Sequence, residues 1–223
     1  MPSSMHFNLS FMTGFIFKCK PKTVLDVGVG YGKWGLLCRE FIEAHADRCF
    51  PKDWKSRVDG VEIWERYIEG FPWLRKIYDQ IYHGDISKIL GSIGKYDMII
   101  AGDIIEHMPK RAAERVLRGL IQRTNKVFLL SIPLGENWLD NKIVDNNPHE
   151  KHQSSWAEAE VMEYFGPTVF KAYQERRATE KVTGGAPAVA FAGPGDARVE
   201  IQIDQFGRGP IGAFAFMKVG AKL

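Results

Sequence analysis

The sequence predicts an α/β fold, with a doubly wound, mainly parallel sheet and an antiparallel C-terminal edge. Strand and helix patterns alternate over most of the 223 residues, which is typical of parallel sheets covered by helices on both faces. In the last third, three strand-like stretches occur with no clear helix among them, which fits an antiparallel edge. The length suits one large domain. We therefore expect a single domain, 1–223, with 1–21 as an N-terminal helix or lid and 176–210 as an extended insertion before the last strand.

Three strands and two helices are predicted in the first half of the chain. The strands are short apolar runs, and the first of them ends in glycine, as buried strands often do. Apolar residues from Trp34 to His45 then recur every three or four positions, which predicts a helix with one face inward. A shorter helix follows the second strand, and Pro72 interrupts it. The predicted strands are 22–28, 58–63 and 80–85, and the shorter helix covers 68–77.

The second half begins with two strong strands on either side of a helix. A further helix is predicted after them, because Ser155 and Glu158 have the spacing of a capping box. The stretch 183–195 is rich in glycine, alanine and proline, which favours a loop or an irregular hairpin. The strong strands are 96–103 and 126–132, the helix between them runs from Ala112 to Ile121, and the last three strands are 168–176, 198–206 and 211–219.

Composition argues against a nucleic-acid partner and a membrane span. The net charge is only +3, and the basic residues do not cluster as an electrostatic footprint requires. The three cysteines show no CxxC spacing, which favours reduced thiols. The apolar stretch 7–17 is too short to cross a bilayer and lacks preceding positive charge, so it predicts an amphipathic helix. We expect a cytoplasmic protein.

The turn after the first strand carries glycines that fit two cofactor patterns. Gly30, Gly32 and Gly35 match the dinucleotide fingerprint GxGxxG. That frame begins inside the following helix, and its expected acid would be Asp53, which ends no strand. The second frame, acid-x-Gly-x-Gly-x-Gly, starts at Asp26, where the strand ends and a ligand-binding turn belongs.

The second frame is followed by Glu62 at the end of the second strand and by Asp85 after the third. Together with VDGVEI, HGDI and YDMIIAGDIIEH in this order, the pattern resembles the class I methyltransferases that use S-adenosyl-L-methionine (SAM). The resemblance covers about 22–165. It implies SAM as the cofactor and the seven-stranded, Rossmann-like methyltransferase sheet as the fold.

The resemblance also implies roles for the residues around the turn. Glu62 would accept hydrogen bonds from both ribose hydroxyls, and Ile63 would pack on the adenine. Asp85 would accept from the adenine amino group, and Asp26 would orient the methionine ammonium. The implied cofactor-binding residues are Asp26, Gly28, Gly30, Tyr31, Gly32, Glu62, Ile63, Asp85, Ile86, Gly102 and Asp103.

Three histidines are candidates for the catalytic base, because imidazole titrates near neutrality. Glu106 and His107 follow the fourth strand, and this Glu-His pair is similar to one in small-molecule methyltransferases of the family. His149 and His152 lie in a segment similar to one that closes over the acceptor in some relatives. No two of these histidines have ligand spacing on one helix, and class I enzymes usually need no metal, so we expect none.

The acceptor is expected to be a small molecule, methylated at a hydroxyl oxygen. The Asn/Asp-Pro-Pro-Tyr pattern for exocyclic amines of bases, the Pro-Cys nucleophile for pyrimidines and the Asp-Asn pair of catechol-type metal sites do not follow the expected strands. Three alternatives stay open: an N- or C-methyltransferase of the same fold, a nicotinamide-dependent oxidoreductase and a non-catalytic nucleotide-binding module. The long loop before the second strand and the C-terminal insertion could each form a lid, an acceptor wall or a subunit contact, which leaves a homodimer open.

Overall fold

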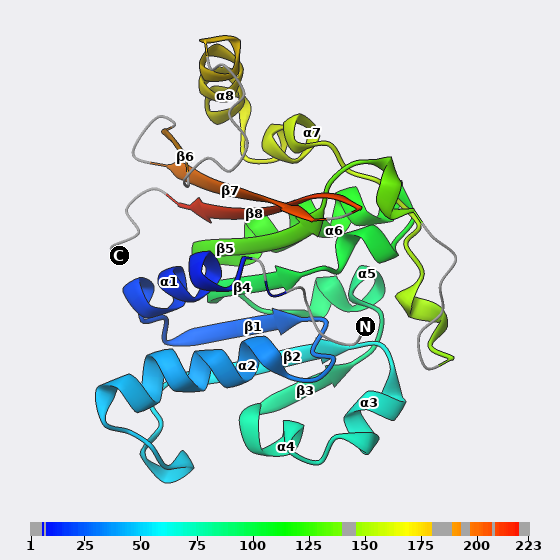
Figure 1. The fold of residues 1–223 in the computed structure, drawn as a ribbon. Coiled ribbons are helices and arrows are strands. Elements are labelled where there is room, and N and C mark those ends of the chain that lie inside the picture. The colour runs from blue at the N-terminus through cyan, green and yellow to red at the C-terminus, as the bar shows by residue number, and fades with distance from the viewer. Residues whose placement is uncertain are drawn as a thin grey trace.

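An eight-stranded sheet runs through the molecule, in the order β3-β2-β1-β4-β5-β8-β7-β6 (Figure 1). The computed structural model describes 6, 8–139, 146–179, 189–192, 197–206 and 208–218. The strand order reverses between β1 and β4, where open α/β sheets place their ligands. The predicted doubly wound, mainly parallel sheet with an antiparallel C-terminal edge is confirmed.

The parallel half of the sheet contains the predicted strands. Neighbouring strands in β3-β2-β1-β4-β5 all pair in parallel. The centre is almost fully buried on both faces, as the apolar runs predicted. The five strands are β1 (Thr23–Val27), β2 (Arg57–Glu62), β3 (Gln80–His83), β4 (Tyr96–Gly102) and β5 (Thr124–Pro133).

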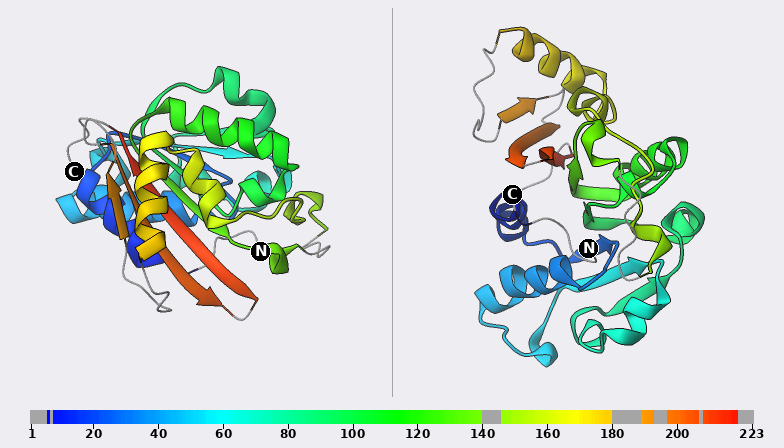
Figure 2. Two further views of the ribbon diagram at one scale, coloured as in Figure 1. Left: turned by 90° about the horizontal axis from the view of Figure 1, so that it is seen from above. Right: turned by 45° about the vertical axis from the view of Figure 1, so that its right-hand side comes forward.

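Helices cover both faces of the sheet (Figure 2). On one face lie α1 (Leu9–Cys19), α2 (Lys33–Cys38) and α4 (Leu74–Ile77), whose apolar side chains share one core cluster with the sheet. The opposite face carries α5 (Ile86–Ile89), α6 (Lys110–Arg123) and α7 (Glu158–Glu163), around a second cluster. Helix α3 (Glu65–Gly70) is separated from α4 at Pro72, as predicted. The two clusters give the layered packing that alternating elements require.

The apolar stretch near the N-terminus forms α1, which packs on α2 and β8. Its side chains Met12 and Ile16 are fully buried. Among the described residues, no helix combines the length and the apolar character that crossing a bilayer requires.

The C-terminal third of the chain differs from the sequence prediction in three ways. The stretch 168–176 was predicted to be a strand, but it lies in helix α8 (Pro167–Thr179). The edge consists of β8 (Gly209–Met217), β7 (Arg198–Phe206) and β6 (Val189–Ala192), all antiparallel. Strand β6 falls in the predicted loop or hairpin 183–195 and adds an eighth strand. Helix α7 begins after Ala157, not Ser155, and Glu160 accepts from the Ala157 N–H at 3.2 Å.

Candidate active site

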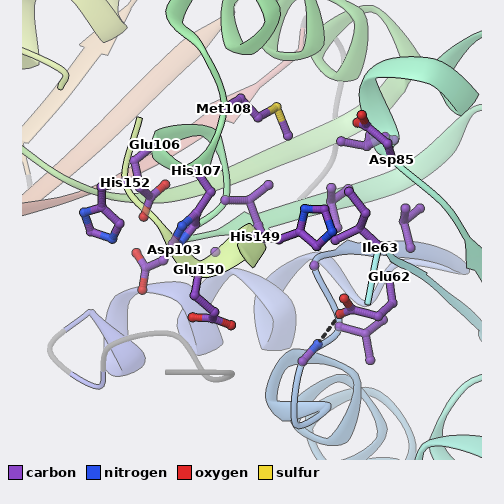
Figure 3. A pocket seen from close by; sticks show the side chains of 18 of the residues that line it. Glu62, Ile63, Asp85, Asp103, Glu106, His107, Met108, His149, Glu150 and His152 are labelled. Atoms are coloured by element: carbon purple, nitrogen blue, oxygen red, sulfur yellow. Dashed lines mark hydrogen bonds between the residues drawn. The ribbon is translucent and has the colours of Figure 1, made fainter. Parts of the chain in front are cut away.

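A cavity of about 560 Å³ opens at the carboxyl ends of β1, β2 and β4. Pockets for small ligands commonly measure about 300–1,000 Å³. Eleven of the fourteen predicted site residues line this cavity (Figure 3). They are Gly28, Gly30, Glu62, Ile63, Asp85, Ile86, Gly102, Asp103, His107, His149 and His152.

The glycine turn lies against the carboxylate of Glu62. Gly28 has a φ of +85° and Gly30 one of +49°, which L side chains adopt only with strain. A Cβ at Gly28 would lie 1.9 Å from Cδ1 of Ile104. Glu62 accepts from the Gly30 N–H at 2.8 Å and from the Trp64 N–H at 2.8 Å. These two bonds fix a carboxylate at the tip of β2, on the cavity wall.

Burial raises the pKa of Glu62, and the amide hydrogen bonds from Gly30 and Trp64 act against this rise. Glu62 as a whole residue is only 5% exposed. A ligand hydroxyl that donates to it in this dry setting would make a charge-assisted hydrogen bond.

Asp85 and Ile86 form the neighbouring part of the wall. Asp85 is the N-cap of α5 and accepts from the Ser87 N–H at 2.8 Å. Its carboxylate still lines the cavity, while the Ile86 side chain is buried. Asp85 therefore both caps α5 and forms part of the cavity wall.

Asp26, Tyr31 and Gly32 were predicted to bind the cofactor, but they do not line the cavity. Asp26 is fully buried below the turn and accepts from the Tyr78 hydroxyl at 2.5 Å. Desolvation is the main reason that its pKa rises to about 7. Tyr31 is half exposed and stacks on Phe71 at 4.3 Å between ring centroids. Asp26 therefore stabilises the turn from the buried core, and Tyr31 packs against Phe71 on its outer side.

The other end of the cavity begins where β4 ends. Asp103 has a φ of +53° and accepts from the Ser131 hydroxyl at 3.0 Å, which holds it across the tips of β4 and β5. Glu106 follows in a 3₁₀ turn and is 1% exposed. Neither carboxylate oxygen of Glu106 has a hydrogen-bond partner among the described residues. Burial, and then the charges of Asp103 and Glu150, raise the pKa of Glu106 well above its ordinary value.

His107 and His152 meet beside Glu106, with ring centroids 4.7 Å apart. Nδ1 of His152 lies 2.8 Å from the Trp138 carbonyl oxygen. A carbonyl oxygen only accepts, so Nδ1 carries the proton and Nε2 of the neutral ring keeps its lone pair. Burial, and then the neighbouring His152, lower the pKa of His107 to about 4. The His107 ring is therefore neutral at pH 7 and a weak base, with a lone pair that can bind a cation.

His149 stands apart from this pair (Figure 3). It lines the same cavity, but its ring packs edge-on against Trp64 at 5.8 Å, near the Glu62 end. Two of the three predicted histidines, His107 and His152, therefore lie together at the Glu106 end of the cavity, and His149 lies alone at the Glu62 end.

Comparisons with solved structures identify proteins that share the fold of this chain. Among 523 matched chains, magnesium protoporphyrin IX methyltransferase from Synechocystis PCC 6803 with bound SAM shares 12% identity at a TM-score of 0.56, over 95% of this chain and 78% of that one. TehB from Haemophilus influenzae shares 13% identity at a TM-score of 0.55, over 96% of this chain and 62% of that one. A SAM-dependent methyltransferase from Archaeoglobus fulgidus shares 14% identity at a TM-score of 0.54, over 95% of this chain and 92% of that one.

The chain has the class I methyltransferase fold. No protein-family model matches the sequence. No curated protein matches it either.

The structure argues against the dinucleotide alternative, because the acid that it requires is not in the cavity. Asp53 lies exposed in the 3₁₀ turn Pro51–Asp53 and does not line the cavity, whereas Glu62 does. The frame that begins at Asp26 also matches the observed end of β1 at Val27.

Several lining residues were not among the sequence-predicted site. Lys33 follows the glycine turn directly, and burial lowers its pKa. Glu150 lies between His149 and His152 in the sequence, and this position next to two predicted site residues could have identified it. Tyr67 and Arg208 come from α3 and the β7–β8 turn, and no sequence signal connects them with the methyltransferase motifs.

Proposed function

We propose that the chain is a SAM-dependent methyltransferase that acts on a small-molecule acceptor through a hydroxyl oxygen. The observation that carries the proposal is the Glu62 carboxylate, fixed on the wall of a cavity that also contains the imidazoles of His107 and His152. When bound, SAM supplies a methyl group on a positively charged sulfur. In the transfer, the bond from this methyl carbon to sulfur breaks while the bond to the acceptor oxygen forms.

The residues of the cavity fit the two halves of this reaction. Glu62 accepts from the ribose hydroxyls, and Asp85 accepts from the adenine amino group. The positive φ of Gly28 and Gly30 forms the turn that brings the backbone to the cavity wall. The remaining task is to align the acceptor and exclude water, which is how enzymes assist an in-line displacement.

The acceptor loses its hydroxyl proton to an imidazole. Nε2 of His152 is suited to this, because Nδ1 already donates to the Trp138 carbonyl and orients the ring. His107 is the alternative base, and a weaker one, because burial lowers its pKa to about 4. A hydroxyl acceptor is favoured because an imidazole nitrogen with a lone pair can take up its proton, and the cavity wall is partly apolar around Ile104, Met108 and Trp138.

Calorimetry with S-adenosylhomocysteine (SAH) and with NADH tests the proposal. We expect SAH to bind and NADH not to bind. Glu62→Ala should weaken SAH binding at least tenfold, because it removes a charge-assisted pair of hydrogen bonds worth about 1.5–3 kcal/mol. Glu65→Ala is the matched control, since Glu65 is exposed on α3 only three residues away. Normal SAH binding by a folded Glu62→Ala protein would show that the ribose assignment is wrong.

A further inference from the structure

Three potential metal ligands converge at the Glu106 end of the cavity. One ligand atom each from Glu106, His107 and His152 lies within 4.8 Å of the others. Around one tetrahedral ion with ligand distances of about 2.0–2.2 Å, neighbouring ligand atoms are about 3.4 Å apart. The cluster therefore needs to contract by at most roughly 1.4 Å to enclose an ion.

Buried polar atoms of these three groups lack hydrogen-bond partners. Nδ1 of His107 and both oxygens of Glu106 have no hydrogen-bond partner among the described residues. Nε2 of His152 presents a lone pair, because the other nitrogen donates to Trp138. Buried polar atoms are nearly always partnered in folded proteins. A cation satisfies all three groups at once, whereas one proton on Glu106 could satisfy only one of the two imidazole nitrogens.

The cluster is held together by the backbone. The N–H groups of Gln153 and Ser154 both donate to the Glu106 carbonyl oxygen, at 2.7 and 3.0 Å. The Gln153 side-chain amide donates to the His107 carbonyl oxygen at 2.6 Å. These bonds join the turn after β4 to the segment that carries His152, so two distant parts of the chain are positioned before any ligand arrives.

Charge around the cluster favours a cation as well. The carboxyl groups of Asp103 and Glu150 act on Glu106 through their charges. Figure 3 shows both on the same side of the cavity as the cluster. His149, in contrast, points towards Ile63 and is not part of it.

We propose that Glu106, His107 and His152 form a binding site for a divalent transition-metal ion. Two imidazoles and one carboxylate suit Zn²⁺, Fe²⁺, Mn²⁺ or Co²⁺ better than Mg²⁺, which prefers oxygen ligands. The sequence predicted no metal because no two histidines share a helix at ligand spacing. The site instead combines two adjacent residues with a third that lies 45 positions further along the chain.

The metal site stands on this cluster alone, and only its consequence for catalysis rests on the proposed function. An ion open to the cavity would bind the acceptor oxygen and lower the pKa of its hydroxyl. The two imidazoles would then serve as ligands, and the acceptor would be a hydroxyl compound that reaches the ion.

Cobalt binding to tag-free, chelator-treated protein tests the inference without cofactor or acceptor. We expect one Co²⁺ per chain after desalting, with a visible spectrum that lacks thiolate charge-transfer bands. Zn²⁺ should displace it. Glu106→Gln, which is nearly isosteric, and His152→Asn should each weaken binding at least tenfold. His149→Asn is the matched control, because it removes an imidazole from the same cavity but not from the cluster.

Three results would overturn the inference: no retained Co²⁺ or Zn²⁺ in the wild-type protein, unchanged binding by folded Glu106→Gln and His152→Asn, or equal loss in His149→Asn. SAH calorimetry on the same preparations separates the two proposals. Metal binding without SAH binding rejects the proposed function and leaves the metal site standing. SAH binding without metal binding does the reverse.

Discussion

Asp26 is a buried acid whose protonation should affect the stability of the fold. Its pKa rises from 3.8 to about 7, mainly because burial removes water from the carboxylate. Between these two values the folded state retains a proton that the unfolded state has lost. The free energy of unfolding therefore falls as pH rises through this window, by up to about 1.4 kcal/mol per pH unit for one group.

Asp26→Asn should remove this contribution. In urea unfolding at successive pH values, the variant should gain stability relative to wild type between about pH 4 and pH 7. Tyr78→Phe is the complementary variant, because the Tyr78 hydroxyl lowers the pKa of Asp26. It should keep the slope and extend it to higher pH. A stability difference between Asp26→Asn and wild type that is constant over this range would contradict the assignment.

At the scale of elements, Asp85 allows helix capping to be separated from ligand binding. Its carboxylate accepts from the Ser87 N–H and lines the cavity. Asparagine caps helices about as well as aspartate, but alanine does not. Asp85→Asn should therefore retain the free energy of unfolding, whereas Asp85→Ala should lose about 1 kcal/mol.

The same two variants should behave alike in SAH calorimetry. The asparagine variant lacks the negative charge and presents an amide to the ligand, so both variants should bind SAH more weakly than wild type. Chemical denaturation gives the stability of each variant and calorimetry gives its affinity. If Asp85→Asn binds SAH as wild type does, the adenine contact does not involve this carboxylate.

Strands with long apolar runs were predictable, because a strand that is buried on both faces needs apolar side chains at nearly every position. The stretch 168–176 was not, since Thr168, Val169 and Phe170 are typical of strands. A helical signal was nevertheless present: Pro167 at the first helical position, and Val169 and Tyr173 four residues apart, both of which are buried. The eighth strand, β6, was expected only as part of a loop or an irregular hairpin, because the stretch 183–195 around it is rich in glycine, alanine and proline.

For the whole molecule, the predictable part of the site is the part that follows a strand end. Glu62, Asp85 and Gly102 were found because topology brings the carboxyl ends of parallel strands together. The bond between Tyr78 and Asp26 was not predictable, because it joins residues 52 positions apart through packing. The proximity of Glu106 and His152 was not predictable either, because backbone hydrogen bonds between segments far apart in the sequence bring them together.

Ligand binding should stabilise the whole fold, because the cavity wall comes from β1, β2, β4 and the segment that carries His152. At 100 times its Kd, SAH should add about 2.7 kcal/mol to the free energy of unfolding. For a chain of this size, that corresponds to a rise in Tm of roughly 5–11 °C. In scans with and without SAH, Glu62→Ala should show at most about half of this shift at the same ligand concentration, whatever its own Tm, because a tenfold weaker site is then at only about 10 times its own Kd. NADH should produce no shift in either protein. An equal SAH shift in both proteins would place the ligand away from Glu62.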